Sequence, residues 1–288
     1  MQKSYCVAGH IFNVSVPEEL AGSMSQYAPF ECERVAYDPI FSVKVSDSLV
    51  HSDESVLYDQ PTEPGETKIV LYSCAEGIIA RMSPTSARPV SGEVLISPDY
   101  RSAVLHILSK EDALFALNNA IMLVFAFRTA TLGTLEMHAS VIKNGGKGYL
   151  FLAKSGTGKS THSRLWLKNI PGSSLLNDDN PVVRVLEDGS VRVYGSPWSG
   201  KTPCYVNDSC PVGAFVNIHR SAENQLHPIS VFEAYASVYS SSSGFKADPA
   251  MADGLHATIE AVVITVPCFT LDCRPDDEAA VVCASGVR

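Results

Sequence analysis

A glycine-rich segment near the middle of the chain constrains the fold more than any other feature. It reads Ala-Lys-Ser-Gly-Thr-Gly-Lys-Ser-Thr over residues 153–161. The apolar run 148–153 predicts a buried strand before it, and Lys159–Ile170 predicts a helix that ends at Pro171-Gly172. A strand, a glycine turn and a helix in this order aim backbone N–H groups and a helix N-terminus at an anion. We therefore expect an α/β fold with a phosphate-binding loop.

One position of this loop departs from the strict phosphate-loop pattern, which has a glycine where this chain has Ala153. Alanine fits there if its φ is negative. The alternative interpretation is a tight turn that happens to contain Lys-Ser. The sequence Leu-Leu-Asn-Asp-Asp-Asn-Pro over 175–181 argues against that alternative, because it predicts a strand that ends in two aspartates.

The residue types of the loop are those that hold a nucleoside triphosphate with magnesium. Backbone N–H groups can cradle the phosphates, the Lys159 ammonium can neutralise the β and γ oxygens, and the Ser160 hydroxyl can reach the metal. Thr161 lies at the same helix end and can touch an α-phosphate. We expect ATP and Mg2+ as the cofactors. The expected nucleotide-binding residues are Ser155, Gly156, Thr157, Gly158, Lys159, Ser160 and Thr161.

Asp178 and Asp179 supply the carboxylates that phosphoryl transfer needs. One can bind the metal while the other receives the proton of the acceptor. Adjacent side chains on a strand face opposite ways, so both can serve one site only if the strand ends there. Asn180-Pro181 predicts that it does. A turn with capping aspartates is the alternative, since Asn-Asp-Asp-Asn-Pro also favours a turn.

The overall composition argues against several classes of protein. A formal net charge of −9 over 288 residues argues against a nucleic-acid partner. The eight cysteines include no C-x-x-C pair, which argues against a zinc or disulfide framework and for a reducing cytoplasm. The first residues lack the apolar core of a signal peptide. The longest apolar run, 120–127, is far shorter than the roughly 18 residues of a membrane helix. We expect a cytoplasmic protein with no membrane partner.

The chain is expected to form two domains. Residues 1–110 predict a β-rich module, in which short alternating runs such as 41–45 and 68–72 are separated by turn residues. Residues 111–288 are expected to form the nucleotide-binding domain, opening with an apolar helix over 111–131 that packs the two parts together. Since the first part shows no catalytic pattern, it is expected to hold the acceptor or a partner, or to cover the second domain.

Consecutive strands flank the glycine loop. The runs 137–143 and 147–153 predict one hairpin across Asn144-Gly145-Gly146, and 181–186 with 190–194 predict a second across Asp188-Gly189. A doubly wound nucleotide domain would instead alternate strands and helices. We therefore expect an α/β (α+β) fold with a mixed, β-rich sheet. Further along, the pattern predicts a helix over 231–239, a connector or lid over 240–254, a strand over 268–273 and a helix over 276–284.

These motifs together resemble a known family. The segment from His138 to Gly200 resembles the catalytic domain of HPr serine kinase/phosphorylase, and more distantly the nucleotide core of ATP-dependent phosphoenolpyruvate carboxykinase. The matching pieces are His138-Ala-Ser, Ser155-Gly-Thr-Gly-Lys-Ser160 and Asp178-Asp179. The resemblance implies a carboxykinase-like fold with Asp178 as the base, Asp179 as a metal ligand beside Ser160, and His138 at a phosphate or the metal. An ordinary hydrogen-bonded histidine is the alternative for His138.

One feature of that family is altered here. The arginine-glycine pair expected after the aspartates is Tyr194-Gly195, and Lys201 a few residues later can supply the missing cation. The resemblance implies an ATP-dependent phosphotransferase acting on the hydroxyl of an unknown acceptor, such as a serine of a protein or peptide, or a small molecule. Two alternatives stay open, a carboxykinase-like enzyme and an inactive nucleotide-binding regulator. The family also leaves a homo-oligomer open.

Overall fold

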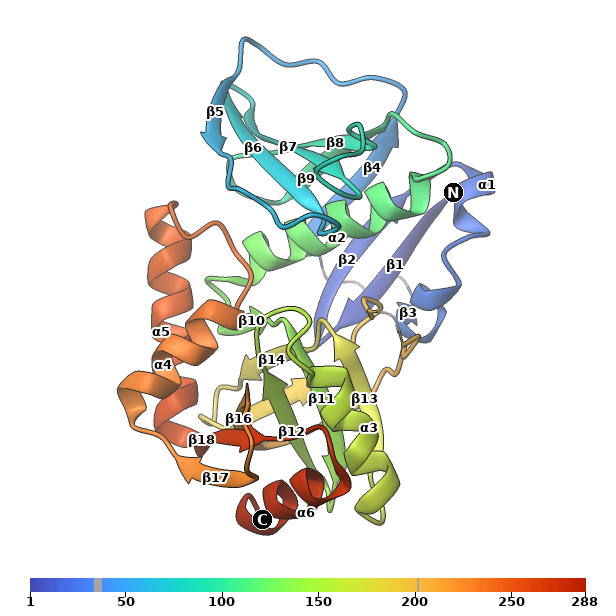
Figure 1. The fold of residues 1–288 in the computed structure, drawn as a ribbon. Helices are drawn as coiled ribbons and strands as arrows, with labels where there is room; N and C mark the ends of the chain where they lie inside the picture. The colour runs from blue at the N-terminus through green and yellow to red at the C-terminus, as the bar shows by residue number, and fades with distance from the viewer. Residues whose placement is uncertain (34–37, 201) are drawn as a thin grey trace. The chain divides into compact units, whose positions relative to one another are not determined.

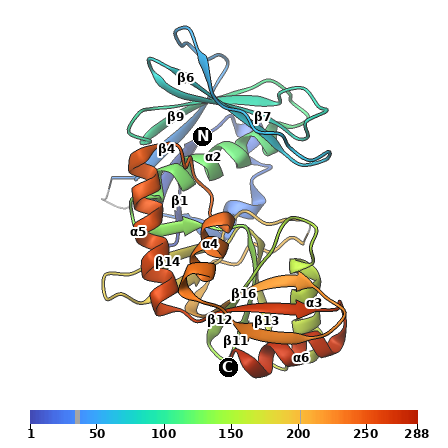
Figure 2. The same ribbon diagram turned by 60° about the vertical axis from the view of Figure 1, so that its left-hand side comes forward.

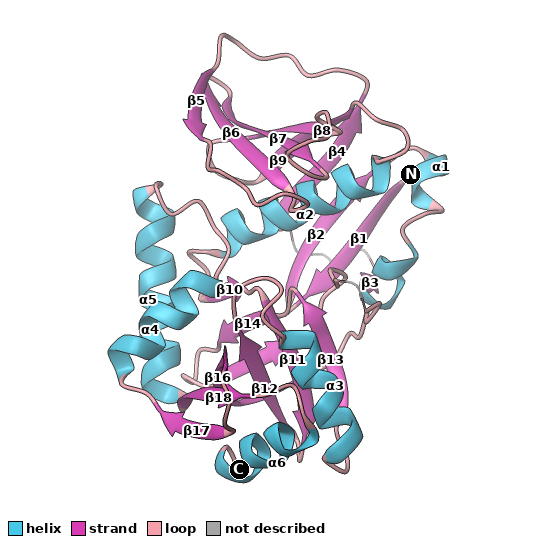
Figure 3. Cartoon of the chain, viewed as in Figure 1, coloured by secondary structure: helices cyan, strands magenta, loops and turns pink. Residues whose placement is uncertain are grey.

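The computed structural model describes residues 1–33, 38–200 and 202–288. The chain divides into two compact units, Met1–Arg128 and Thr129–Arg288. Each unit is built on one mixed β-sheet with helices packed against it, as Figure 1 shows by position in the chain and Figure 3 by type of element. The expected fold class, a mixed and β-rich α/β fold, is confirmed.

The first unit is a strongly bent sheet with one long helix. Its described strands follow the order β3-β1-β2-β4-β9-β8-β7-β6-β5. The helical elements are α1 (Glu18–Ala21), the 3-10 segment η1 (Ser25–Phe30) and α2 (Ala113–Thr129). The strands are β1 (Gln2–Val7), β2 (His10–Ser15), β3 (Glu31–Cys32), β4 (Phe41–Ser46), β5 (Ser55–Tyr58), β6 (Lys68–Cys74), β7 (Gly77–Ser83), β8 (Gly92–Ile96) and β9 (Ser102–Ile107).

Helix α2 packs on one face of this first sheet. The Phe125 ring meets the rings of Phe12 and Phe41 edge-on, with centroids 6.2 and 6.4 Å away. At its end, Arg128 Nε donates to a backbone carbonyl next to β4 at 3.0 Å. Burial of these apolar side chains gives the helix its place in the first unit. The chain therefore divides after Arg128 rather than after residue 110, and the helix expected to open the second domain belongs to the first unit.

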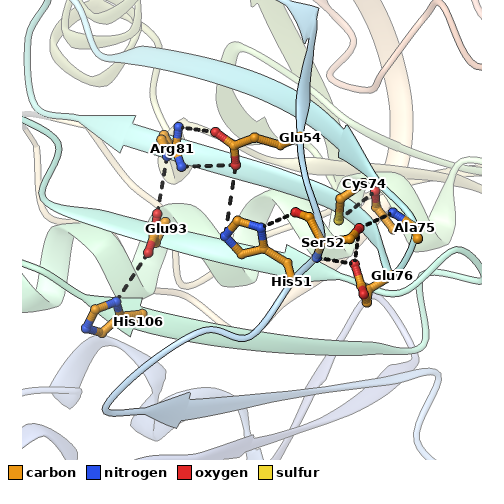
Figure 4. A network of polar contacts seen from close by, with 10 residues as sticks. His51, Ser52, Glu54, Cys74, Ala75, Glu76, Arg81, Glu93 and His106 are labelled. Atoms are coloured by element: carbon orange, nitrogen blue, oxygen red, sulfur yellow. Dashed lines mark hydrogen bonds and ion pairs between the residues drawn. The ribbon is translucent and has the colours of Figure 1, made fainter.

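The opposite face of the first sheet carries a network of ion pairs (Figure 4). Arg81 of β7 donates from both terminal nitrogens to Glu54 and from Nε to Glu93, and Glu93 also meets His106. These side chains are partly exposed, so each pair adds little to stability. Within the described ranges, no group of three or more His, Cys, Asp or Glu side chains is arranged to hold a metal ion. We assign this network no chemistry.

The second unit contains the glycine-rich loop. Its sheet follows the order β10-β14-β15-β16-β12-β11-β13, and β18 and β17 continue from β16. The helices are α3 (Lys159–Asn169), α4 (Val231–Ser241), α5 (Pro249–Thr265) and α6 (Asp277–Gly286). The strands are β10 (Thr134–Glu136), β11 (Ala139–Asn144), β12 (Lys147–Leu152), β13 (Ser174–Asp179), β14 (Val182–Val185), β15 (Val191–Tyr194), β16 (Ser209–Arg220), β17 (Gln225–Pro228) and β18 (Cys268–Cys273).

Helices cover both faces of this second sheet (Figure 2). On one face, α3 and α6 share a core with β12 and β16, in which Phe151 and Trp166 are fully buried. Along β12 the side chains alternate, so Leu152 points to the other face, where α4 packs through Val238. The sheet is thus covered on both faces, and the candidate site lies at its strand ends.

Both predicted hairpins are present in the second unit. β11 joins β12 through Gly145 and Gly146, whose φ values of +57° and +78° suit a two-residue hairpin turn. β14 pairs with β15 across the turn that contains Gly189, at φ +80°. Register in a hairpin is set by its turn, which is why these local patterns sufficed.

The segment 240–254 is not a connector throughout. α4 continues to Ser241, and α5 begins at Pro249. The Asp248 side chain accepts the backbone N–H of Met251 at 2.8 Å, so it caps the new helix. An aspartate cap followed by proline is a regular helix start. The Ser/Gly/Ala-rich composition concealed that signal. No helix in the described parts of the chain is long and apolar enough to span a membrane.

Candidate active site

The sequence-predicted residues meet at one edge of the second sheet. β11 pairs antiparallel with both β12 and β13, so these two strands run in the same direction. β16 and β18 continue the parallel set beyond β12. The carboxyl ends of all four strands therefore share one edge, the place where open α/β sheets bind ligands. The glycine loop follows β12 there, the two aspartates end β13, and His138 directly precedes β11.

The backbone of the loop has a conformation that suits phosphate binding. Gly156 and Gly158 adopt φ of +73° and +138°, which residues with a Cβ rarely adopt. Gly158 caps α3 without a side-chain hydrogen bond in the described structure, so the first-turn N–H groups need another acceptor. Ala153 does not have a positive φ, so an alanine fits in place of the glycine of the strict phosphate-loop pattern. Ser155 is exposed, and Ser160 and Thr161 lie half-buried in the first turn of α3.

An arginine that the sequence did not single out holds the loop. Arg220, the last residue of β16, donates from Nε to the Thr157 carbonyl at 3.0 Å and from Nη2 to the Gly156 carbonyl. These two carbonyl oxygens are therefore turned toward β16, and guanidinium is well suited to bind both because its donors form a rigid fork. The signal was hidden because β16 lies far along the chain from the loop and reads only as an apolar strand.

Lys159 is buried at the centre of the site. Its Nζ lies 3.0 Å from His138 Nε2 and 3.0 Å from the Ala153 carbonyl oxygen. Burial lowers the pKa of Lys159, and the charges of Asp179 and Asp178 oppose that shift. The same His138 nitrogen also lies 3.5 Å from Asp179 Oδ1, so the imidazole stands between the lysine and this carboxylate.

The two aspartates differ in their surroundings. Asp178 is only 6% exposed, and its Oδ1 accepts from the Ser140 hydroxyl at 2.7 Å. Ser140 Oγ also lies 2.6 Å from Ser163 Oγ, which ties β11, β13 and α3 together. Because Ser163 is one turn from Ser160, Asp178 lies on the face of the sheet that α3 covers. Asp178 is a fixed, internal carboxylate.

Asp179 is the accessible member of the pair. Its side chain is 36% exposed, and its Oδ1 lies 3.5 Å from His138 Nε2. Burial of its remaining surface raises the pKa of Asp179, whereas His138 and Lys159 act in the opposite direction. The backbone N–H groups of Asp179 and Asn180 both donate to Asn177 Oδ1 at 2.9 Å, so the strand ends in a local turn. The strand thus ends at Asp179, as expected, and the turn that follows leaves the choice between a functional pair and a plain turn to experiment.

Gly195 and Gly200 have plain structural surroundings. A Cβ on Gly195 would lie 1.9 Å from the Val206 carbonyl oxygen, so close backbone packing requires glycine there. Gly200 lies against Asp178 and Asp179, and Lys201 falls outside the described residues. His162 is buried and accepts from Trp166 Nε1 at 3.1 Å, which fits a structural role.

The donors at this edge suit magnesium. Ser160, Asp178 and Asp179 offer hydroxyl and carboxylate oxygens, the hard ligands that Mg²⁺ prefers. Magnesium in nucleotide sites uses one or two carboxylates and takes its other ligands from phosphates and water. Such a site does not need three protein carboxylates or imidazoles, and none of the described residues form such a group.

A buried glutamate near this edge was not predicted from the sequence. Glu136, the last residue of β10, is 1% exposed, and neither carboxylate oxygen has a well-placed hydrogen-bond partner among the described residues. Burial raises the pKa of Glu136 to about 7; the Ser243 side chain opposes the shift and the Asp179 charge adds to it. The glutamate is therefore protonated in the folded protein under mildly acidic conditions.

Stability is expected to fall as the pH rises because of Glu136. The unfolded chain releases this proton near the ordinary glutamate pKa of 4.5, and the folded chain only near 7. The stabilisation of the folded protein that comes from this raised pKa is complete below pH 4.5. It is lost as the pH rises through 7, and the free energy of unfolding falls by about 3 kcal/mol. Glu136→Gln should remove this pH dependence. Urea unfolding at pH 5 and pH 8 measures it, with the exposed Glu187→Gln as the control. A Glu136→Gln protein that loses as much stability as the wild type would contradict the expectation.

Comparison with known proteins finds a distant structural similarity. No protein-family model matches the chain, and no curated protein matches it. Among solved structures, it is similar to the structure of the Hpr(Ser) kinase/phosphatase from Coxiella burnetii. The two chains are 12% identical, the TM-score is 0.31, and the match covers 53% of this chain and 93% of that chain. The relationship is a distant structural one.

Proposed function

We propose that this protein is an ATP-dependent phosphotransferase that moves the γ-phosphoryl group of Mg-ATP to a hydroxyl group. The observation that carries the proposal is the row of contacts at the sheet edge. Lys159 Nζ lies 3.0 Å from His138 Nε2, and that nitrogen lies 3.5 Å from Asp179 Oδ1. An ammonium that can neutralise phosphate oxygens and an accessible carboxylate that can take up a proton thus flank one imidazole, and phosphoryl transfer needs both kinds of group in one site.

The residues of this chain divide the work as follows. Backbone N–H groups of Gly156–Lys159 bind the phosphates, and the Lys159 ammonium neutralises their β and γ oxygens. Asp179 receives the proton of the acceptor hydroxyl, because it is accessible and its raised pKa suits a base. His138 positions Lys159 and Asp179 relative to each other.

Magnesium would be held by the Ser160 hydroxyl and by Asp178, directly or through water. A bound magnesium ion would neutralise the negative charge on the β and γ phosphate oxygens. Asp178 is favoured for this role because it is fixed by Ser140 on the face of α3. This order of the two aspartates is the reverse of the one implied by the family resemblance, and the variants discussed below distinguish the two orders.

The test is consumption of ATP by the full chain. We expect saturable binding of Mg-ATP and slow release of inorganic phosphate when water is the acceptor. Adding a fractionated extract should transfer radioactive γ-phosphate to a component with an acid-stable, alkali-labile phosphoester, the behaviour of phosphoserine. Formation of phosphoenolpyruvate from oxaloacetate would instead show a carboxykinase-like enzyme. Binding with no turnover under either condition would show a regulator, and no binding of Mg-ATP would overturn the proposal.

A further inference from the structure

A cavity of about 340 Å³ opens beside the glycine loop, within the second unit. The loop and the first turns of α3 form one side of it, through Thr161 and Leu165. The ends of β16 and β18 form the other, through Ile218, Arg220 and Arg274. The volume is in the range of pockets that hold small organic ligands. None of the residues given a catalytic role above, Asp178, Asp179, His138 or Lys159, lines it.

The cavity and the two aspartates lie on opposite sides of the strand that leads into the glycine loop. In the sheet, β13 with its aspartates lies on one side of β12, whereas β16 and β18 lie on the other. The cavity is on the β16 and β18 side. If the γ end of a triphosphate lies near Asp179, its α end points toward the β16 and β18 side, where Thr161 lines this cavity. A group attached to the α-phosphate would then lie next to the cavity.

The walls of the cavity suit a flat, electron-rich ring. Leu165, Ile218 and Pro275 supply apolar surface, and the two charged side chains that line it are both arginines. Arg220 is held by the loop carbonyls, and Arg274 by Asp276 and Glu278 at 2.8 and 2.9 Å. Guanidinium groups fixed in this way can stack on an aromatic ring or donate to its nitrogen and oxygen atoms.

We propose that this cavity binds the nucleoside part of the triphosphate, with the base between the β16 and β18 ends. The inference rests on the proposed function, since it needs the phosphates in the glycine loop. It goes further by assigning the affinity for the base to Ile218, Arg220 and Arg274, away from the catalytic side chains. The cavity is then the part of the site that distinguishes a nucleotide from an inorganic polyphosphate.

The test compares two ligands and two variants of the full chain by calorimetry. The ligands are Mg-ATP and Mg-tripolyphosphate, which carries the phosphates without a nucleoside. Ser221→Trp fills the cavity from an exposed position that lines it, and the Ser221 backbone bond to Cys273 does not depend on the side chain. Ala222→Trp adds the same side chain at the neighbouring exposed position, outside the cavity.

We expect the wild type to bind ATP at least tenfold more tightly than tripolyphosphate. Ser221→Trp should abolish that preference and leave tripolyphosphate binding intact, and Ala222→Trp should change neither. Equal affinity of the wild type for the two ligands would overturn the cavity assignment while the phosphate site stands. Equal loss of both ligands in Ser221→Trp would also overturn it. A wild type that binds neither ligand would instead refute the proposed function.

A photochemical label on the wild type gives an answer that does not depend on a variant folding. Irradiation with 8-azido-ATP should label the segments 218–221 or 273–275, which line the cavity. Excess unlabelled ATP should prevent the labelling, and excess tripolyphosphate should also reduce it by occupying the loop. Competable label that falls only outside these two segments would overturn the proposal.

Discussion

Asp179→Asn is expected to lower the rate of phosphoryl transfer by about a hundredfold or more, the usual scale for removal of a general base. The amide keeps the size and the hydrogen bond of the side chain but cannot take up the acceptor's proton. Affinity for Mg-ATP should change only a few-fold, because the phosphates are held by the loop and by Lys159. Single-turnover transfer and calorimetry separate these two quantities.

Asp178→Asn, compared with Asp179→Asn, shows which aspartate holds magnesium and which is the base. The amide oxygen can still accept from Ser140, so the fold should survive. If Asp178 helps to hold magnesium, the magnesium concentration needed for half-maximal activity should rise. The exposed Asp188→Asn serves as a control with no expected effect. If Asp178→Asn instead abolished transfer with binding intact, while Asp179→Asn altered the magnesium dependence, the order implied by the family resemblance would hold. Normal transfer by both variants would reduce the pair to a turn.

Lys159→Ala is expected to weaken the binding of Mg-ATP at least tenfold. A hydrogen bond to a charged group contributes about 1.5–3 kcal/mol, which corresponds to roughly 10- to 150-fold in affinity. The lysine is 8% exposed and already lies among His138, the Ala153 carbonyl and the aspartates, so little reorganisation is needed before a phosphate binds.

Lys168→Ala is the matched control for Lys159→Ala. It removes the same charge from the same helix, but Lys168 lies about two and a half turns beyond Lys159, and its ammonium pairs with Asp277. Calorimetry with Mg-ATP and thermal unfolding of the ligand-free proteins measure affinity and fold separately. Equal affinity of Lys159→Ala and the wild type would show that the loop does not use its lysine, and the phosphate-binding assignment would have to be abandoned.

Local patterns alone determined the elements of this protein that lie close together in the chain. The strand before the glycine loop, the helix from Lys159 and both hairpins were predictable, because turn and capping preferences act within a few residues. The closeness of the glycine loop to Asp178 and Asp179 in space was predictable as well. A strand that ends in carboxylates can reach the loop only if both strands share an edge, and the motif itself implies that arrangement.

Tertiary structure decided which of those residues are accessible and what surrounds them. Asp178 and Asp179 are neighbours with one chemistry, yet packing buries the first and exposes part of the second. Arg220 supports the loop only because β16 pairs with β12 over a long sequence separation. The burial of Glu136 and the place of α2 in the first unit have the same origin. Burial and long-range pairing depend on the whole sheet, so no short segment of the sequence can encode them.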